Sequence, residues 1–296
     1  MIAVDWGTSS FRAYRLDASG RVLEARSAAS GIMTVAAGAF PHVLEAQLGN
    51  WLEDTPIVMS GMIGSRQGWL EIPYADCPAG AVEIARGVRP VTWGAGRRAW
   101  IVPGLSCRDE AGVPDVMRGE ETQLLGALGD LPEGEATICL PGTHSKWVRL
   151  RDGRILSFAT AMTGEAFAIM RRHSILGRLM PEGEDRDDDA WFDAGVRRAG
   201  EAGGLLHHLF GVRARGLFGE VPAEGLASYL SGILIGREIA DLAPAAGRVH
   251  IIGAPRLAAL YERALRTSGL AATILDPDCV VRGLFLLASH LPEGAP

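Results

Sequence analysis

Short apolar runs followed by small polar turns begin both halves of this chain. The first run covers residues 1–6, the turn is Gly7-Thr8-Ser9-Ser10, and polar and apolar residues then alternate from Arg12 to Leu16. A buried run followed by alternation predicts two strands joined by a turn with a polar tip. Residues 20–25 predict a third strand, so the chain is expected to start as an antiparallel three-stranded sheet.

The rest of the first half predicts a helix, a strand and a region rich in turns. Apolar residues at helical spacing predict a helix over residues 38–53. An apolar strand from residue 55 leads into a loop rich in Gly and Ser that contains Ser65 and Arg66. At the carboxyl end of such a strand, a loop is a common place for a ligand, although an ordinary loop is an equal alternative. Residues 69–115 are dense in Pro, Gly and Trp, with a short strand at 99–103.

A helix with two acidic residues in its first turn is predicted to follow Gly119. Gly119 is an acceptable N-cap, and Glu120 and Glu121 come directly after it. The helix dipole alone favours acidic residues there, and it would keep them ionised at neutral pH and able to accept a proton. A general base at this position is therefore one interpretation, and helix stabilisation is the other.

The second half repeats the opening pattern at an offset of about 135 residues. After a linker at 131–135, the pattern predicts a strand at 136–140, a turn at 141–146, a strand at 147–150 and a third strand at 154–158. The same order of elements in both halves favours a duplicated fold with a cleft between the halves over two unrelated hairpins.

The remaining sequence predicts mostly helices. Apolar spacing indicates helices at 164–180, 190–210, 227–239, 256–268 and 279–290, with a strand beginning at residue 249. Between that strand and the next helix, Gly253 and Ala254 form a turn of small residues that would let a flat ring approach the backbone; an ordinary turn is the alternative. The acidic run 182–189 is expected to be a solvated loop, because consecutive like charges repel one another.

The first turn has the residue types that bind a magnesium nucleotide. Gly7 would allow a turn that other residues resist, and the amides and hydroxyls of Thr8 and Ser9 could point at one anion. Asp5 at the strand end could hold Mg²⁺ through water, since Mg²⁺ takes few carboxylates. The alternative is an ordinary hairpin in which Asp5 accepts hydrogen bonds from the turn.

Composition narrows the class of protein. A net charge of -6 argues against a nucleic-acid partner, and no apolar run reaches the ~20 residues of a membrane helix. Because residues 1–12 lack the features of a signal peptide, a cytoplasmic location is expected. The four cysteines are far apart, so neither a zinc site nor a disulfide framework is indicated. Lys146, in the second turn, is the single lysine among 29 basic residues.

Five motifs in order along the chain resemble the 2-dehydro-3-deoxygalactonokinase family, within the superfamily of acetate and sugar kinases, Hsp70 and actin. The motifs are Asp5-Trp6-Gly7-Thr8-Ser9-Ser10-Phe11-Arg12, residues 60–69, residues 117–123, residues 140–147 and residues 229–232. The resemblance implies an α/β fold of two duplicated actin/ribonuclease H-like lobes with an interlobe nucleotide cleft. It also implies an N-terminal lobe over residues 1–133 and a C-terminal lobe over 134–296, with the helix 279–290 packing back on the first lobe.

The resemblance further implies an ATP- and Mg²⁺-dependent kinase that phosphorylates the 6-hydroxyl of 2-dehydro-3-deoxy-D-galactonate in galactonate catabolism. The phosphates would lie between Gly7, Thr8 and Ser9 on one side and Gly142, Thr143 and His144 on the other, with Lys146 adding positive charge unless it is simply a solvated lysine. Gly253 and Ala254 would meet the adenosine. Glu120 or Glu121 would be the base, and Arg66 would bind the substrate carboxylate near Ser65, with Arg12 and Arg118 as other candidates.

Two points depart from the wider sugar-kinase pattern, and several alternatives stay open. Pro141-Gly142 replaces the usual Asp-Gly of the second hairpin, so Mg²⁺ would rely on Asp5 and water. A glutamate stands where relatives usually have a catalytic aspartate. A kinase of another small sugar or acid, or a non-catalytic nucleotide-gated protein like actin or a chaperone, are the rival hypotheses. The sequence does not separate the galactonate from the gluconate epimer, and it leaves a homodimer open.

Overall fold

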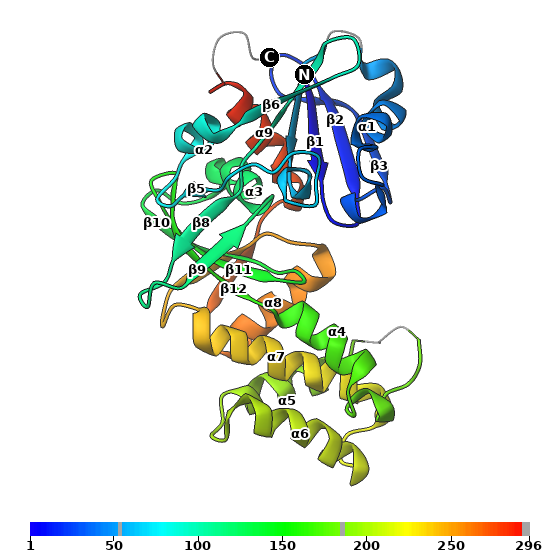
Figure 1. Cartoon of the computed structure of the whole chain (residues 1–296). Helices are drawn as coiled ribbons and strands as arrows, with labels where there is room; N and C mark the ends of the chain where they lie inside the picture. The colour runs from blue at the N-terminus through cyan, green and yellow to red at the C-terminus, as the bar shows by residue number, and fades with distance from the viewer. Residues whose placement is uncertain (53–54, 184–186, 292–296) are drawn as a thin grey trace. The chain divides into compact units, whose positions relative to one another are not determined.

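The computed structural model describes residues 1–52, 55–183 and 187–291 and divides into two compact units (Figure 1). Unit 1 comprises Met1–Glu135, Arg149–Phe158 and the C-terminal segment that begins at Asp276. Unit 2 comprises Ala136–Val148 and Ala159–Leu275. These units differ from the expected lobes, which meet at a single boundary between residues 133 and 134. The reason is that two later segments group with the N-terminal residues.

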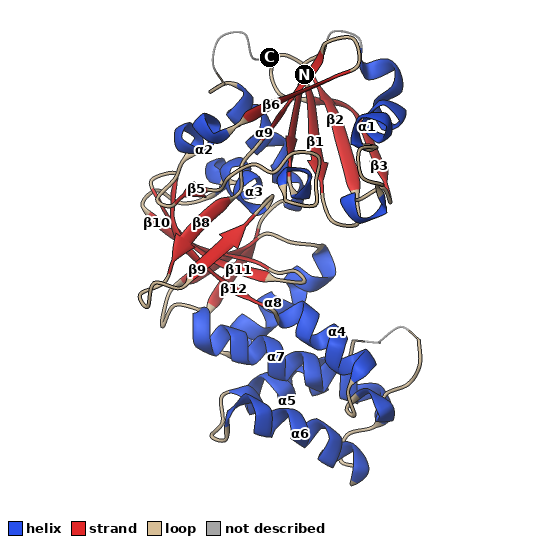
Figure 2. Cartoon of the chain, in the orientation of Figure 1, coloured by secondary structure: helices blue, strands red, loops and turns tan. Residues whose placement is uncertain are grey.

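Unit 1 is built on a six-stranded sheet in the order β3-β2-β1-β4-β7-β6 (Figure 2). The β1–β2–β3 ladder is antiparallel, β4 runs parallel to β1 and to β7, and β6 is antiparallel to β7. Asp5 at the end of β1 pairs with Arg12 on one side and with Ser60 on the other. The strands are β1 (Ile2–Trp6), β2 (Phe11–Leu16), β3 (Val22–Ala28), β4 (Ile57–Ser60), β6 (Arg89–Trp93) and β7 (Arg97–Ile101).

A small sheet and four helices complete unit 1. The three-stranded sheet, in the order β5-β8-β9, consists of β5 (Ala75–Asp76), β8 (Leu105–Arg108) and β9 (Pro114–Met117). The helices are α1 (Phe40–Leu48), α2 (Ala81–Gly87), α3 (Glu120–Gly126) and α9 (Val280–Ala288). The last helix, α9, packs closely on α3: a Cβ at Gly126 would lie 1.8 Å from the Cys279 carbonyl oxygen, and one at Gly283 would lie 1.9 Å from that of Thr122. Only glycine allows this close approach.

Unit 2 contains most of a five-stranded sheet in the order β12-β11-β10-β13-β14. β13 runs parallel to both β10 and β14. The strands are β10 (Glu135–Leu140), β11 (Ser145–Arg151), β12 (Arg154–Ala161), β13 (Arg248–Ile251) and β14 (Ala271–Ile274). The helices are α4 (Thr163–His173), α5 (Asp189–Ala199), α6 (Gly204–Leu217), α7 (Leu226–Leu242) and α8 (Pro255–Thr267).

The two main sheets confirm the duplicated α/β architecture. In each, three consecutive strands form one side, and later strands extend the sheet beyond the first strand of the trio, three in the first sheet and two in the second. Each sheet has its own apolar core, with Trp6, Phe11 and Leu44 in the first, and Phe192, Val249 and Tyr261 in the second. Two cores that are separate in sequence and similar in order are what a duplicated fold requires.

Several helix boundaries differ from those expected. The helix expected over 38–53 ends earlier, because Gly49 takes a left-handed φ of 49° and a short 3₁₀ turn follows; residue 53 lies outside the described residues. The helix expected over 190–210 is two helices, α5 and α6, separated at Gly203 and Gly204, whose φ values of 125° and 75° interrupt the helix. The helix α2 and the three-stranded sheet were not expected in the region of residues 69–115.

Candidate functional site

The first turn, residues 7–10, is held by its own hydrogen bonds and by the chain that follows β3. The Gly7 amide donates to the Ser10 carbonyl at 2.9 Å, and the Gly7 and Thr8 carbonyls accept from Ile32 and Met33. A Cβ at Gly31 would lie 2.3 Å from the Thr8 carbonyl oxygen, whereas one at Gly7 would meet nothing closer than 3.6 Å. The expectation that the turn needs glycine at position 7 is therefore wrong, because a Cβ would fit there and Gly31 is the glycine that the turn requires. A phosphate-binding role for Gly7 stays a prediction.

Asp5 makes an ion pair across the hairpin. Arg12 donates to Asp5 Oδ2 from Nη2 at 2.5 Å and from Nε at 3.1 Å. On the other side of Asp5 is Gly61, where a Cβ would lie 3.3 Å from Asp5 Oδ1 and 2.8 Å from the Trp6 carbonyl oxygen. The carboxylate is thus fixed by a guanidinium on one oxygen, with backbone close to the other.

Three polar side chains of unit 1 have buried atoms that lack a hydrogen-bond partner within the described residues. They are Ser60 Oγ, Ser65 Oγ, and Nε and Nη1 of Arg118. The remaining Arg118 nitrogen, Nη2, donates to the Ile72 carbonyl at 2.7 Å, and the guanidinium lies over the Tyr74 ring at 4.4 Å. Buried polar atoms without partners are uncommon and costly, so a group of them is a candidate binding site for oxygen-rich ligands.

The three arginines predicted to bind an acid are in different environments. Arg12 is paired with Asp5, Arg66 is exposed, and Arg118 is half-buried over an aromatic ring. Close contact between Arg118 Nη1 and Gly64, where a Cβ would be 2.8 Å away, links Arg118 to the loop that carries Ser65. Arg118 therefore has unpaired donors and contacts the loop that carries Ser65, whereas the Arg66 side chain is exposed.

The two glutamates at the start of α3 also differ. Both lie in the first turn after the Gly119 N-cap, as expected. Glu121 is fully buried; its carboxylate accepts from the Gly119 amide at 2.6 Å and from Thr122 Oγ1 at 3.0 Å. Burial, followed by the neighbouring Glu120, raises the pKa of Glu121 to about 8. The expectation that the helix dipole keeps both glutamates ionised is therefore wrong for Glu121, because loss of solvation outweighs the dipole.

Glu120 is the more accessible of the two. It is half-buried, and its Oε2 accepts from the Arg118 amide at 2.9 Å. Gly119 connects these residues to the Asp5 region, since a Cβ there would lie 3.3 Å from the Cα of Gly61. Asp5, the serine loop and the start of α3 thus form one continuous polar region within unit 1.

The second turn, residues 141–144, is held by the start of α4. The Glu165 amide donates to the Thr143 carbonyl at 3.0 Å, and Glu165 Oε2 lies 2.5 Å from His144 Nε2. A Cβ at Gly164 would lie 2.5 Å from the Gly142 carbonyl oxygen, so α4 can approach the turn only with glycine there. Lys146 is buried, and its Nζ donates to Thr160 Oγ1 at 2.8 Å. The alternative of a solvated lysine is therefore wrong.

A buried carboxylate connects the elements around this turn. Glu238 on α7 accepts from Trp147 Nε1 at 2.7 Å and from Tyr261 Oη at 2.7 Å, with a longer contact of 3.3 Å from Ser145 Oγ. A hydrogen bond with the Thr163 side chain adds α4 to the set. Burial raises the pKa of Glu238, and the donors around it act in the opposite direction. The carboxylate joins β11, α4 and α8 to α7.

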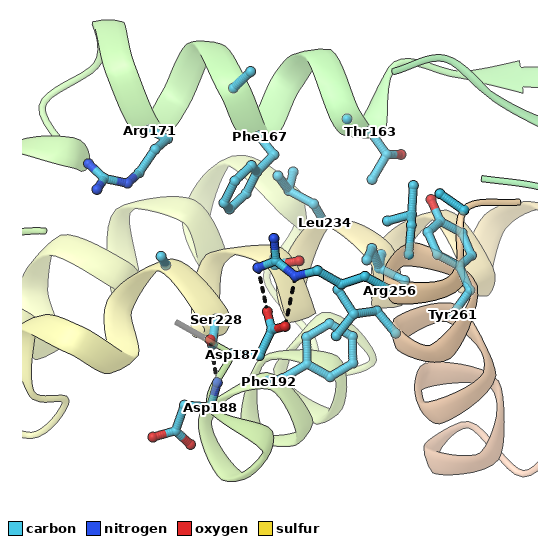
Figure 3. A pocket seen from close by; sticks show the side chains of 18 of the residues that line it. Thr163, Phe167, Arg171, Asp187, Asp188, Phe192, Ser228, Leu234, Arg256 and Tyr261 are labelled. Atoms are coloured by element: carbon cyan, nitrogen blue, oxygen red, sulfur yellow. Dashed lines mark hydrogen bonds and ion pairs between the residues drawn. The ribbon is translucent and has the colours of Figure 1, made fainter. Parts of the chain in front are cut away.

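Between α4, α7 and α8 lies a cavity of about 820 Å³, within unit 2 (Figure 3). It extends from Gly142 in the second turn to Ala254 at the start of α8. Phe167, Leu234 and Phe192 contribute apolar surface, and Arg171 and Arg256 contribute charge. A cavity of this size, mostly apolar with a few polar groups, suits a small organic ligand. Gly253, predicted beside Ala254, is not among the residues that line it.

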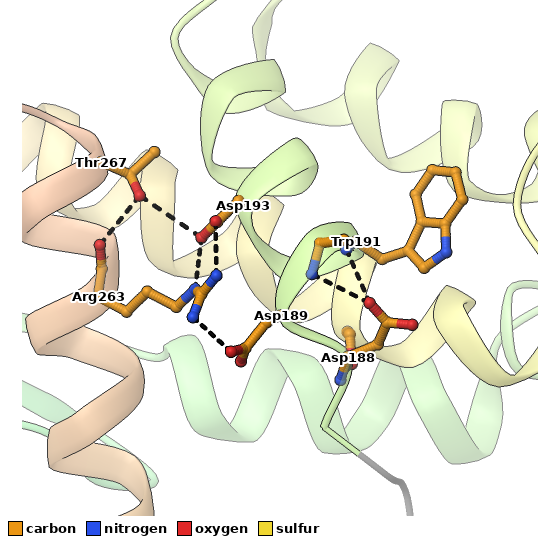
Figure 4. Close-up of polar contacts among 8 residues, drawn as sticks. Asp188, Asp189, Trp191, Asp193, Arg263 and Thr267 are labelled. Carbon is orange, nitrogen blue, oxygen red and sulfur yellow. Dashed lines mark hydrogen bonds and ion pairs between the residues drawn. The ribbon is translucent and has the colours of Figure 1, made fainter.

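The acidic run before α5 helps to build this cavity. Asp187 accepts from Arg256 Nε at 2.8 Å and from Nη2 at 2.7 Å, and these hydrogen bonds lower the pKa of Asp187. Asp188 caps α5 by accepting from the amides of residues 190 and 191, and Asp189 pairs with Arg263 (Figure 4). Asp187, Asp188 and Asp189 thus make specific contacts, although Asp187 and Asp189 stay exposed as a solvated loop would have them. Residues 184–186 of the run lie outside the described residues.

Comparisons with known proteins assign the chain to a family. The family model for 2-keto-3-deoxy-galactonokinase matches residues 5–287. A probable 2-dehydro-3-deoxygalactonokinase of Rhizobium meliloti is 42% identical over 287 residues, covering 95% of this chain and 93% of the relative. The 2-dehydro-3-deoxygalactonokinase of Escherichia coli is 36% identical over 281 residues, covering 94% of this chain and 93% of the relative.

The chain belongs to the 2-keto-3-deoxygalactonokinase family. A crystal structure from Sinorhizobium meliloti, assigned to the same activity, superposes with a TM-score of 0.90 at 41% identity and covers 97% of each chain. A dehydratase activator from Clostridium difficile, solved with bound ADPNP, has a TM-score of 0.51 at 14% identity and covers 98% of this chain and 95% of its own, and this likeness concerns the fold alone. The resemblance read from the five motifs is confirmed.

For this family member, the sequence did not point to several residues of the polar region of unit 1 and of the second turn and cavity of unit 2. Ser60, Tyr74, Phe167, Arg256 and Glu238 were not among the predicted site residues, although each contacts one of the sites described here. Ser60 could have been found from its place before Gly61 at the end of a predicted strand. The others come from helices and loops that are distant in sequence, and no local pattern indicates them.

Two further observations concern metal-binding clusters and membrane-spanning helices. Within the described residues, no three His, Cys, Asp or Glu side chains cluster in a way that could hold a metal ion. None of the described helices has both the length and the apolar character of a membrane span. A metal held mainly by one carboxylate, water and substrate phosphates does not require such a cluster.

Proposed function

We propose that this chain transfers the γ-phosphoryl group of ATP to the 6-hydroxyl of 2-dehydro-3-deoxy-D-galactonate and releases 2-dehydro-3-deoxy-6-phospho-D-galactonate. The observation that carries the proposal is membership of the family across residues 5–287, with 42% identity to a relative named for this reaction. The polar region of unit 1 and the cavity of unit 2 supply the two kinds of site that the reaction needs.

The sugar acid is assigned to the polar region of unit 1, with Arg118 as the residue that binds its carboxylate. The unpaired Nε and Nη1 of Arg118 can donate to two oxygens, and a planar guanidinium suits a planar carboxylate. Ser60 and Ser65 offer hydroxyls to the keto and hydroxyl oxygens of the same ligand. Arg66, which is exposed, and Arg12, which is committed to Asp5, are less suited to this role.

Glu120 is assigned as the base that accepts the proton of the attacking hydroxyl. A base must be ionised and able to reach the substrate. Glu121 meets neither condition, because it is fully buried and its pKa is raised to about 8. Its hydrogen bond from the Gly119 amide suggests a different role, which is to hold the turn that positions Glu120.

The nucleotide is assigned to unit 2. The adenosine would occupy the cavity between α4, α7 and α8, and the phosphates would extend toward Gly142, which lines its edge. Thr143 and His144 are exposed next to Gly142 and are available to phosphate oxygens, while the pairing of His144 with Glu165 sets the direction of the imidazole. Lys146 is assigned to supporting this turn from behind, since it is buried and bound to Thr160.

Asp5 is assigned to the hydration shell of a Mg²⁺ ion carried by the ATP phosphates. One oxygen is taken by Arg12 and the other faces the Gly61 backbone, which fits contact through water better than direct coordination. The ion would neutralise charge that develops on the transferred phosphoryl group. This assignment, a cytoplasmic location and the choice of galactonate epimer stay predictions.

A coupled assay of ADP release tests the function. The chain is supplied with ATP, Mg²⁺ and, in separate reactions, 2-dehydro-3-deoxygalactonate, its gluconate epimer, gluconate and glucose. We expect the highest kcat/KM with 2-dehydro-3-deoxygalactonate and a product phosphorylated at the 6-hydroxyl, identified by ³¹P NMR.

The same assay separates the rival hypotheses. Comparable turnover with glucose or gluconate would point to a broader sugar kinase and contradict a dedicated one. Tight binding of ATP with no phosphorylated product from any of the four acceptors would contradict the kinase proposal and favour a nucleotide-gated binding protein.

A further inference from the structure

Helix α6 exposes an apolar strip that unit 2 does not use. The strip consists of Leu206, Phe210, Leu217 and Phe218, whose exposed fractions are 84%, 62%, 61% and 83%. Their spacing places them on one side of the helix and its C-terminal end. The opposite side already packs into unit 2 through His208, Leu209 and Val212.

Apolar residues on both sides make α6 unusual for a surface helix. A helix at the edge of a globular protein normally turns charged residues to solvent. The two arginines of α6 do not serve that purpose: Arg213 donates to the Ile175 carbonyl, and Arg215 pairs with Glu220 and lies over the Tyr229 ring at 5.1 Å. These two arginines therefore leave the strip without a charged cover. The helix α6 itself lies beside α5, at the end of unit 2 (Figures 1 and 2).

The strip is large enough to form the centre of an interface. At roughly 200 Å² for a fully exposed large side chain, its four members offer about 600 Å² of apolar surface. A stable dimer of standard size buries about 800 Å² on each partner. The strip would supply most of that area, and its neighbours on α6 would supply the rest as a rim.

Charge and symmetry favour a second copy of this chain as the occupant. The chain has a net charge of -6, so two copies repel one another over most of their surface, yet residues 202–219 contain no Asp or Glu. Leu206, Phe210 and Leu217 lie along one face of α6, and Phe210 is near the middle of the strip. Two antiparallel α6 helices could therefore cross near Phe210, with Leu206 of one copy against Leu217 of the other.

We propose that the α6 strip is the interface of a homodimer, in which two α6 helices pack antiparallel about a twofold axis near Phe210. Such an isologous contact uses the same patch on both copies and closes after two chains. The proposal does not rest on the proposed function, because no residue of the strip lines the cavity or the polar region of unit 1.

Sedimentation velocity of the full chain tests the proposal. We expect a species of twice the 31.4 kDa chain mass for the native protein and of single mass for Phe210→Glu and for Leu206→Glu. Val113→Glu is the matched control, since Val113 is 59% exposed on a turn of unit 1, and it should sediment like the native protein. Circular dichroism of each variant checks that the helices are retained.

Oxidative crosslinking of Phe210→Cys tests the register. Two cysteines at the crossing point should form an intermolecular disulfide readily, while Val113→Cys and the native chain, whose cysteines are buried or half-buried, should not. A native protein that is monomeric at micromolar concentration would overturn the proposal. A dimer that survives both charge variants, or that leaves Phe210→Cys uncrosslinked, would also overturn it, because the interface would then lie elsewhere or in another register.

Discussion

The turns of units 1 and 2 share a backbone pattern but differ in the residues beside them. Gly142 and Thr143 follow Gly7 and Thr8 by 135 residues, and at that offset the pair Asp5 and Arg12 corresponds to Leu140 and Trp147. Unit 1 therefore has an ion pair where unit 2 has two apolar positions. The order of five strands is shared, so the charged chemistry belongs to unit 1 and not to the duplicated fold itself.

The buried carboxylates extend the contrast. Glu238 in unit 2 joins the strand after the turn to three helices, and it lies behind a cavity large enough for a nucleoside. Glu121 in unit 1 accepts hydrogen bonds from Gly119 and Thr122 at the start of its own helix. Nearby in the sequence, Arg118 has nitrogens without a hydrogen-bond partner among the described residues. One unit is thus organised to hold a large ligand, and the other leaves polar atoms free for a small one. The two units thus have similar folds, and different residues next to their turns give them different roles.

The largest expected effect comes from the proposed base. Glu120→Gln should reduce kcat by about 10²-fold or more, because the amide cannot accept the proton of the attacking hydroxyl. ATP binding, measured by calorimetry, should stay close to the native value. Glu165→Gln is the matched control in unit 2, since Glu165 is also an acid beside a turn, but it pairs with His144. A larger loss of kcat in Glu165→Gln than in Glu120→Gln would reverse the assignment of roles to the two units.

A smaller effect is expected for substrate recognition. Arg118→Ala should raise KM for the sugar acid by about 10- to 100-fold, from the loss of charged hydrogen bonds worth about 1.5 to 3 kcal/mol. KM for ATP should change little. Arg66→Ala, which removes an exposed arginine from the neighbouring loop, should change either KM by less than about threefold. Equal effects of the two substitutions on the sugar-acid KM would argue against Arg118 as the carboxylate ligand.

The complementary test concerns the nucleotide cavity. Phe167→Ala removes apolar surface from the cavity and should raise KM for ATP by about 10-fold, while KM for the sugar acid is retained. Ile169→Ala on the same helix is the control, because Ile169 is 48% exposed and does not line the cavity. If Phe167→Ala instead raised the sugar-acid KM, the division of ligands between the units would be wrong.

Local patterns predicted the parts of the fold that depend on neighbouring residues. The alternation from Arg12 to Leu16 and the repeated pattern near Gly142 each depend on consecutive residues, and the two sheets confirm the strands that they predict. The ends of helices were less predictable, as at Gly203 and Gly204, because glycine can either stay in a helix or leave it. The cavity could not be predicted from local sequence patterns, because Phe167 and Arg256 line it from helices almost 90 residues apart.

The choice between the two glutamates shows why part of the site was beyond the sequence. Both follow Gly119, and the helix dipole treats them alike. They differ in burial, and α3 itself is packed by a distant element, because α9 contacts it through Gly126 and Gly283, more than 150 residues apart. Burial of Glu121 is a property of the tertiary structure, and burial decides its pKa.

The smallest expected effect tests that burial directly through the pH dependence of stability. Glu121 has a pKa of about 8 when folded, against 4.5 for an ordinary glutamate. Between these values the folded chain carries a proton that the unfolded chain has lost, so the free energy of unfolding falls as pH rises, by at most about 1.4 kcal/mol per pH unit. Glu121→Gln has nothing to titrate there, and its amide can still accept from Gly119 and donate to Thr122. Urea unfolding at pH 6 and pH 7 should therefore show a steeper loss for the native chain than for Glu121→Gln, whereas Glu120→Gln keeps the native slope. Parallel slopes in all three proteins would mean that Glu121 is ionised when folded, and the distinction between base and buried support would then fail.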